Sequence, residues 1–273
     1  MIPEMEQLSK FFLSDAYFEA ALHDPTRVGL SDEDLAGKPP ERIRDMVLGE
    51  AFFRLSRAAG EAAYLKLFKA QWGYVSPEWF DHRLHALSLE AEWTDFFSMS
   101  ADNVISVLPL GGRLLSLCAG DAFYERWWYA RRAAEVVCVD INPDCYRHYL
   151  RLHQSPNVSY HLADVLSFVP PADLFDVVVI RGAIEHFSQE NQQRIFHKAL
   201  AAMKPGGWFC GDTPASLTTG GKMLPAHDFE WRDEAQMRQE LSHVFAHVET
   251  QVLVSKERTT LFWRCQKATE SRG

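Results

Sequence analysis

The residues with the clearest capacity for chemistry lie where an apolar run gives way to small residues. Residues 114–117 predict a short buried strand, residues 118–120 are small and predict a tight turn, and Phe123 begins an aromatic segment that predicts a helix. Small residues let a ligand lie against the backbone, and the N–H groups at a helix start attract its anionic end. The turn between strand and helix therefore predicts a ligand site.

An acidic residue ends the next predicted strand. Residues 136–139 are apolar and Asp140 follows them, about 20 residues after Gly120, where nucleotide-binding folds place the carboxylate that binds a ribose diol. We expect Asp140 to bind a ribose and assign Ile141, directly after it, to the same site. The alternative is that Asp140 only caps the helix that follows.

Four later segments extend this pattern, and together they resemble the class I S-adenosylmethionine-dependent methyltransferases from about Leu110 to Cys265. They are Ala163–Val165, Phe175–Ile180, Ile184–Phe187 and Met203–Gly207. Each segment alone is weak evidence for the family, but their order and spacing together are typical of it. Residues 76–83 and 227–231 also resemble one bacterial branch of it, which we take as acting on small molecules.

The resemblance implies S-adenosylmethionine as the cofactor. Gly120 matches the central glycine of the family's turn, Asp164 the partner of the adenine amino group, and Val165 a residue packed on the adenine ring. The cofactor carries no phosphates, so the turn needs fewer glycines than a pyrophosphate site does.

The turn also departs from the family. Ser116 stands where the family has an acid, Cys118 replaces the first glycine, and Ala122 replaces the last. All three positions are still assigned to the turn, and Ser116 and Cys118 to the cofactor site. Asp121 could supply the missing carboxylate or could cap the following helix. These departures motivate a second hypothesis, a protein that keeps the fold and binds the cofactor with little or no turnover.

Two histidines are candidates for a catalytic base. His186 lies in the loop after the fourth predicted strand, which faces the transferred methyl group in this fold, and His227 lies after the fifth. Structural roles are the alternative for both. Arg181, assigned to the cofactor site, ends the fourth strand where metal-dependent catechol-type relatives carry an aspartate, so we expect no metal.

The acceptor class follows from what is missing after the fourth strand. The sequence has neither the Asn-Pro-Pro-Tyr type of motif nor a Pro-Cys nucleophile there, which speaks against methylation of base or glutamine amides and of cytosine carbon. We expect transfer to a small molecule, at oxygen, without a nucleic-acid partner. A nicotinamide-dependent oxidoreductase is a distant third hypothesis, because the turn offers no cradle for phosphates.

The order of predicted elements divides the chain in two. Residues 1–105 show only helical periodicity and are expected to form a cap or lid, in which Arg83 could bind the cofactor's carboxylate or merely form a surface ion pair. Residues 106–273 alternate strands with helices and predict an α/β doubly wound sheet of seven strands, mostly parallel. Residues 247–254 and 259–265 are joined too tightly for a parallel crossover and predict an antiparallel hairpin.

Composition sets the remaining limits. The net charge of −9 argues against a general nucleic-acid binder, and five cysteines without a CxxC pair indicate reduced core residues. No signal peptide or uninterrupted apolar stretch of membrane length is seen. We therefore expect a cytoplasmic protein without membrane partners; a homodimer is compatible with the sequence, which does not fix the oligomeric state.

Overall fold

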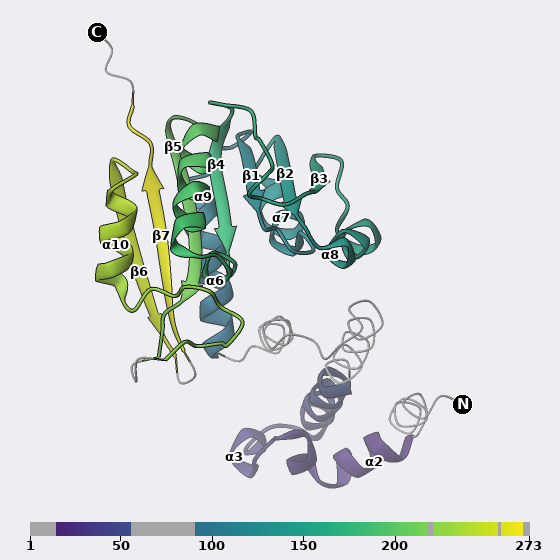
Figure 1. Ribbon diagram of the computed structural model, residues 1–273. Helices are drawn as coiled ribbons and strands as arrows, with labels where there is room; N and C mark the ends of the chain where they lie inside the picture. The colour runs from purple at the N-terminus through teal and green to yellow at the C-terminus, as the bar shows by residue number, and fades with distance from the viewer. Residues whose placement is uncertain (1–14, 56–90, 218–220, 256–257, 270–273) are drawn as a thin grey trace. The chain divides into compact units, whose positions relative to one another are not determined.

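The computed structural model describes residues 15–55, 91–217, 221–255 and 258–269 (Figure 1). The chain divides into two compact units, Met1–Glu90 and Ala91–Gly273. Each unit is described by itself below. Arg83 lies outside the described residues.

The described part of the first unit is helical. Its elements are α2 (Asp15–His23), η1 (Pro25–Val28), α3 (Asp32–Leu35) and a helix over residues 40–55. Ser31 and Asp34 form a capping box that starts α3, each side chain accepting the other's backbone N–H. Buried apolar residues from α2, η1 and the helix over residues 40–55 pack together: Ala21, Val28, Val47 and Ala51. The helical character predicted for this region is confirmed for the described residues.

The second unit is built on one sheet of seven strands. The strands are β1 (Arg113–Leu117), β2 (Glu135–Asp140), β3 (Val158–Leu162), β4 (Phe175–Arg181), β5 (Met203–Pro214), β6 (His247–Val254) and β7 (Thr259–Gln266). Their order is β3-β2-β1-β4-β5-β7-β6, with β1 to β5 parallel and β7 antiparallel to both of its neighbours. The predicted sheet and its C-terminal hairpin are confirmed.

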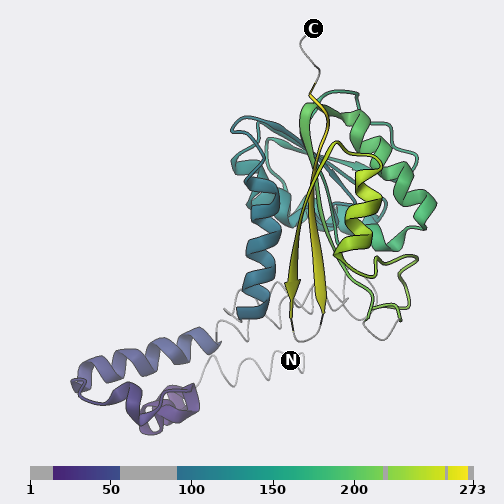
Figure 2. The ribbon, with the colours of Figure 1, turned by 90° about the vertical axis from the view of Figure 1, so that its left-hand side faces the viewer.

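Helices cover both faces of this sheet. They are α6 (Ala91–Ile105), α7 (Phe123–Trp127), α8 (Pro143–His148), α9 (Gln189–Ala202) and α10 (Glu234–Ser242), with short helical turns at η2 (Tyr129–Arg131), η3 (Tyr149–His153) and η4 (Ile184–His186). Figure 2 shows α6 on one side of the sheet and α9 and α10 on the other. The central strands are therefore buried on both faces, as parallel strands usually are.

The boundary between the units differs from the predicted one. Residues up to 105 were predicted to belong to the helical cap, whereas α6 runs from Ala91, belongs to the second unit and packs on β5 and β7. Asn103, on its last turn, donates from Nδ2 to the carbonyls of Gly211 and Trp263 at 3.0 and 3.1 Å. The sheet thus holds α6 by buried polar bonds, which hydropathy alone does not reveal.

Gly211 shows how tightly the sheet packs beside α6. It pairs with Trp263 across β5 and β7, and a Cβ atom on Gly211 would lie 2.0 Å from the Trp263 ring. Real atoms never approach so closely, so the wholly buried indole requires glycine here.

The site described next lies at one edge of the sheet. The first five strands are parallel, so their carboxyl ends share that edge, and ligands of open α/β sheets bind outside it. The turn after β1, the end of β2 and the loops after β4 and β5 are all brought there.

Candidate active site

The turn after β1 has the backbone of a glycine-rich turn although it holds only one glycine. Cys118, Gly120 and Ala122 have φ angles of 53°, 57° and 61°, in the left-handed region. Such a conformation is destabilising by roughly 1–2 kcal/mol for a residue with a Cβ. Cys118 and Ala122, two of the three positions where the sequence departs from the family, thus take a strained conformation that favours glycine. Nothing lies within 4 Å of a Cβ built on Gly120, so the turn is open to a ligand there.

The end of β2 is bound to this turn through Asp140. Its Oδ2 accepts the N–H of Gly120 at 2.9 Å, and its Oδ1 accepts the N–H of Asn142 at 2.8 Å. Burial raises the pKa of the Asp140 carboxyl, and the two N–H bonds partly offset this. Each carboxylate oxygen has a second lone pair, so Asp140 can still accept hydrogen bonds from the hydroxyl groups of a ligand. Ile141 beside it is 67% exposed and offers an apolar surface at the same place.

Tyr160, on β3, supports the same turn from the other side and was not singled out from the sequence. Its hydroxyl donates to the Gly120 carbonyl at 2.6 Å, and its ring stacks on Tyr149 at 4.9 Å between centroids. The local sequence around Tyr160 does not predict this hydrogen bond, because Gly120 lies 40 residues away along the chain.

The residues after β3 form a tight turn. Oδ1 of Asp164 accepts the N–H of Leu166 at 2.9 Å, which leaves the other oxygen for a further donor. Val165 is buried and packs into the main core with Leu117 and Val139.

A buried carboxylate lies against Ser116 and was missed by the sequence analysis. Glu125, on α7, accepts a hydrogen bond from the Ser116 hydroxyl at 2.6 Å. Burial raises the pKa of Glu125, while the Ser116 bond and the charge of Arg181 act in the opposite direction. Glu125, on the helix that follows β1, therefore places a carboxylate next to the strand position where the family has an acid. The sequence feature that could have identified it is a single glutamate in the otherwise aromatic first turn of the predicted helix.

Asp121, the residue proposed to supply that carboxylate, follows Gly120 in the turn, and its charge helps to raise the pKa of Glu125 and of Asp140. It is completely buried, and its Oδ2 is 3.5 Å from Nε2 of His153. The alternative role, capping α7, is not formed, because Ala122 occupies the cap position without a side-chain bond.

Arg181 ends β4 in a partly buried position and is bonded through Nε. Its Nε donates to Oδ2 of Asp212 at 2.8 Å, and its guanidinium lies 3.3 Å from the centre of the Tyr124 ring. Burial, the largest single effect, opposes the charged form, but Asp212, Tyr124, Tyr129 and Glu125 together outweigh it and hold the pKa of Arg181 above its ordinary value. The side chain is a permanent cation at the edge of the site.

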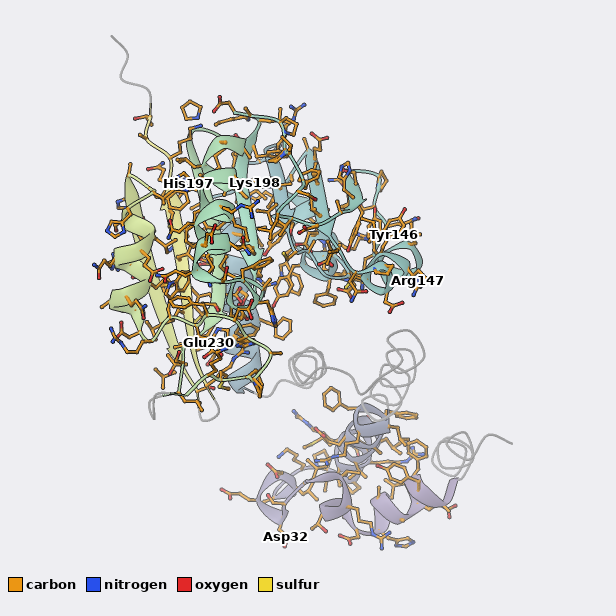
Figure 3. The ribbon with its side chains drawn as sticks, in the orientation of Figure 1. Asp32, Tyr146, Arg147, His197, Lys198 and Glu230 are labelled. Atoms are coloured by element: carbon orange, nitrogen blue, oxygen red, sulfur yellow. The ribbon has the colours of Figure 1, made fainter. Side chains whose placement is uncertain are left out.

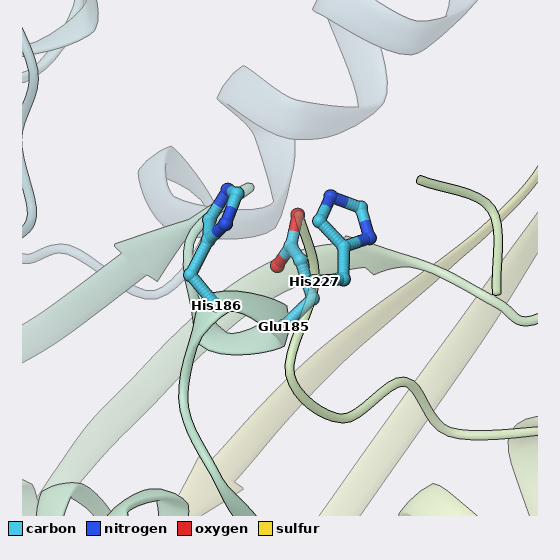
Figure 4. Close-up of side chains that lie close together, drawn as sticks. All are labelled: Glu185, His186 and His227. Carbon is cyan, nitrogen blue, oxygen red and sulfur yellow. The ribbon is translucent and has the colours of Figure 1, made fainter. Parts of the chain in front are cut away.

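The loops after β4 and β5 bring both candidate histidines together with a glutamate. One ligating atom from each of Glu185, His186 and His227 lies within 4.8 Å of the others. The two imidazole rings are 4.8 Å apart and perpendicular, with the Glu185 carboxylate between them (Figure 4). Glu185 and His227 are buried and His186 is exposed, so the cluster has one side facing solvent.

Each member of the cluster is oriented by a further group. Oε2 of Glu185 accepts from the Thr213 hydroxyl at 2.9 Å, and Nδ1 of His186 lies 3.4 Å from the Ala226 carbonyl. Nδ1 of His227 is hydrogen-bonded to Glu230, which also accepts backbone N–H groups of the loop; Figure 3 labels Glu230 in that loop. These contacts turn the other nitrogen of each ring outward.

Backbone bonds and one glutamine hold the two loops against each other. The N–H groups of Asp228 and Phe229 both donate to the Glu185 carbonyl, at 2.8 and 3.1 Å. Nε2 of Gln192, on α9, lies 2.9 to 3.3 Å from the carbonyls of Ile184, Phe187 and Phe229. Gln192 is completely buried, so the cluster rests on a fixed frame.

Burial sets the charge of the cluster. It raises the pKa of Glu185 to about 7, and it lowers the pKa of His186, an effect to which His227 adds. A compact group of two imidazoles and one carboxylate can accept a proton or bind a cation.

Comparison with known proteins agrees with this architecture. Residues 114–207 match a family model described as a methyltransferase domain. They include β1 to β4, the glycine turn, Asp140 and the first two members of the cluster. This segment of the chain is therefore similar to a methyltransferase domain. Domains of this class depend on S-adenosylmethionine, in agreement with the cofactor expected from the sequence.

Solved structures show the same fold for the methyltransferase domain at low sequence identity. Phosphoethanolamine N-methyltransferase 2 of Haemonchus contortus, solved with phosphomonomethylethanolamine and S-adenosylhomocysteine, is 14% identical with a TM-score of 0.55. The match covers 65% of this chain and 53% of that one, so the chain corresponds to about half of that enzyme.

Two further neighbours are matched over most of their own length. The YcgJ protein of Bacillus subtilis is 14% identical with a TM-score of 0.51, over 63% of this chain and 99% of that one. The [4+2]-cyclase SpnF is 14% identical with a TM-score of 0.55, over 66% and 84%. No curated protein sequence matches the chain. In the part of the chain that the structure describes, no helix has the length and apolar character needed to cross a bilayer.

Proposed function

We propose that the protein is an S-adenosylmethionine-dependent methyltransferase that methylates a hydroxyl group of a small molecule. One observation carries the proposal. The open turn at Gly120, with Asp140 bonded to it, shares a sheet edge with the Glu185, His186 and His227 cluster. A nucleoside site and a proton-accepting site therefore lie on the same side of the domain.

The residues present fit the cofactor. Gly120 leaves open space beside its backbone, Asp140 keeps lone pairs for a ribose diol, and exposed Ile141 can cover an apolar ring. Asp164 has a carboxylate oxygen left for the adenine amino group. When bound, the cofactor supplies a methyl group on a sulfonium, whose transfer to oxygen forms a C–O bond, breaks an S–C bond and releases the hydroxyl proton.

Glu125 is proposed to take the place of the acid missing at Ser116. Its carboxylate bonds to the Ser116 hydroxyl and is buried at the end of β1, so the turn keeps a negative group there. The cofactor is cationic at its sulfonium and ammonium groups, and a buried carboxylate beside it is favourable. Arg181 remains a candidate for the cofactor's carboxylate through its guanidinium N–H groups other than Nε.

The histidines are proposed to receive the acceptor's proton. His186 is the exposed member, and His227, supported by Glu230, is the buried one. Imidazole is suited to general-base catalysis, and the chain needs one for a weakly nucleophilic hydroxyl. The first unit remains a proposed lid over this site. A cytoplasmic location is also proposed, supported by free cysteines at all five positions.

A second function, cofactor binding with little or no turnover, is favoured by the strain at Cys118 and Ala122. SpnF has the same fold, but its name describes a cyclisation and not a methyl transfer. The fold therefore does not by itself decide between the two functions.

Methyl transfer from tritiated S-adenosylmethionine to a fractionated pool of small metabolites tests the proposal. We expect label in an organic-soluble, base-stable product with the wild-type protein, and a loss of at least about tenfold with His186→Ala. Binding of S-adenosylhomocysteine without any transfer would support the second function instead. The absence of both cofactor binding and methyl transfer would refute both functions.

A further inference from the structure

We propose that Glu185, His186 and His227 form a binding site for one divalent transition-metal cation. The site lies on the acceptor side of the methyltransferase domain. The binding itself does not depend on methyl transfer. A bound metal would occupy the ring nitrogens proposed above to accept the proton, so it would replace them in that role by holding the acceptor oxygen, and this role rests on the proposed function. The sequence analysis expected no metal, from Arg181 at the end of β4; these ligands come from the turn after it and from the loop after β5.

The three side chains offer a complete protein ligand set. Two imidazole nitrogens and one carboxylate oxygen are the donors that zinc, iron, cobalt and manganese use, and three protein ligands leave coordination positions for water or substrate. The candidate ligand atoms lie within 4.8 Å of one another. Ligands about 2.1 Å from a tetrahedral metal lie about 3.4 Å apart, so the cluster has to contract by less than the length of one bond. His186, the exposed member, can move by side-chain rotation.

The surrounding contacts are those of a metal site. Ligating histidines usually place the second ring nitrogen on a carboxylate or a backbone carbonyl, which fixes the tautomer and directs the first nitrogen at the metal. Here Nδ1 of His227 is bonded to Glu230 and Nδ1 of His186 lies against the Ala226 carbonyl. Thr213 holds the distal oxygen of Glu185. Each proposed ligand thus has a partner that leaves its ligating atom facing the other two.

The frame of the cluster explains why these partners lie so close together. The loop that carries His227 donates two backbone N–H groups to the Glu185 carbonyl, and Gln192 bonds carbonyls on both loops. A fixed backbone keeps the ligands within reach of one another before any ion arrives.

Titration of the untagged, chelator-treated full chain with Co²⁺ tests the inference. Co²⁺ is a spectroscopic probe for zinc-type sites, since its visible absorption reports on nitrogen and oxygen ligands. We expect about one equivalent to bind with saturable absorption and Zn²⁺ to displace it. His186→Ala and Glu185→Gln should each weaken binding at least about tenfold, and Glu230→Gln about 10- to 100-fold by loosening His227.

The matched control is His197→Ala. His197 is exposed on α9, away from Glu230 in the view of Figure 3, and its removal should leave the Co²⁺ affinity unchanged. Circular dichroism shows whether each variant folds; His186→Ala removes an exposed side chain and should fold in any case. Absence of saturable Co²⁺ binding by folded wild-type protein, or equal affinity in His186→Ala, would overturn the inference. Methyl transfer at an unchanged rate by metal-free protein would refute the metal's role in holding an acceptor oxygen and would leave the proposed function standing.

Discussion

Replacing Asp140 by asparagine should weaken cofactor binding without unfolding the domain. Asparagine has the same shape but no charge, and one of its two terminal groups is a donor. Since both carboxylate oxygens of Asp140 accept backbone N–H groups, one of the bonds to Gly120 or Asn142 is lost. That loss should lower the free energy of unfolding by about 0.5–1.5 kcal/mol.

The effect on binding follows from the ribose diol. Hydrogen bonds to a charged acceptor contribute about 1.5–3 kcal/mol and bonds to a neutral one about 1, so two hydroxyls lose about 1–4 kcal/mol in total. The dissociation constant for S-adenosylhomocysteine should rise roughly 5- to 900-fold. Isothermal titration calorimetry measures it directly.

Asp173→Asn is the control for this substitution. Asp173 precedes β4, at the opposite edge of the sheet, and pairs with Lys267 at 2.6 Å on the surface. Its replacement should leave the dissociation constant unchanged. An unchanged dissociation constant in folded Asp140→Asn would refute the assignment of Asp140.

The remaining predictions concern the frame of the site. Gln192→Leu strands three carbonyls and should lower the free energy of unfolding by about 1–3 kcal/mol in chemical denaturation; an unchanged midpoint would show that the loops do not depend on it. Ser116→Asp should destabilise by about 1–3 kcal/mol because it faces Glu125, and adding Glu125→Ser should recover most of that, a coupling that a double-mutant cycle measures. Gly211→Ala should lower the free energy of unfolding by at least about 1–3 kcal/mol through overpacking, and a neutral result would contradict the packing. Because burial raises the pKa of Asp140 and a ribose binds its ionised form, affinity should fall as the pH drops from neutrality through that raised pKa, while Asp140→Asn should show a flatter profile.

The sheet was predictable because its strands carry strong local signals. Apolar runs such as β1 and β4 end at small or polar residues, and the short link before β7 allows only a hairpin. The ends of the helices were harder to predict. The helix predicted to begin at Phe123 is the short α7 followed by a helical turn, and α8 continues into a π-helical turn.

The parts of the site that the sequence did not predict depend on long-range contacts. Glu125 gains its place through Ser116, and Tyr160 through the Gly120 carbonyl, neither of which periodicity can reveal. The two histidines were treated as rivals for one role. The structure brings them together because the loop after β5 bonds to the Glu185 carbonyl, a pairing that no local motif encodes.

A crystal structure of the protein with S-adenosylhomocysteine tests the central claim most directly. The account predicts ribose hydroxyls within hydrogen-bonding distance of the Asp140 carboxylate and the amino-acid end of the ligand against the turn at Gly120. A nucleoside bound anywhere else, or an Asp140 carboxylate that contacts only its own backbone partners in the complex, would contradict it.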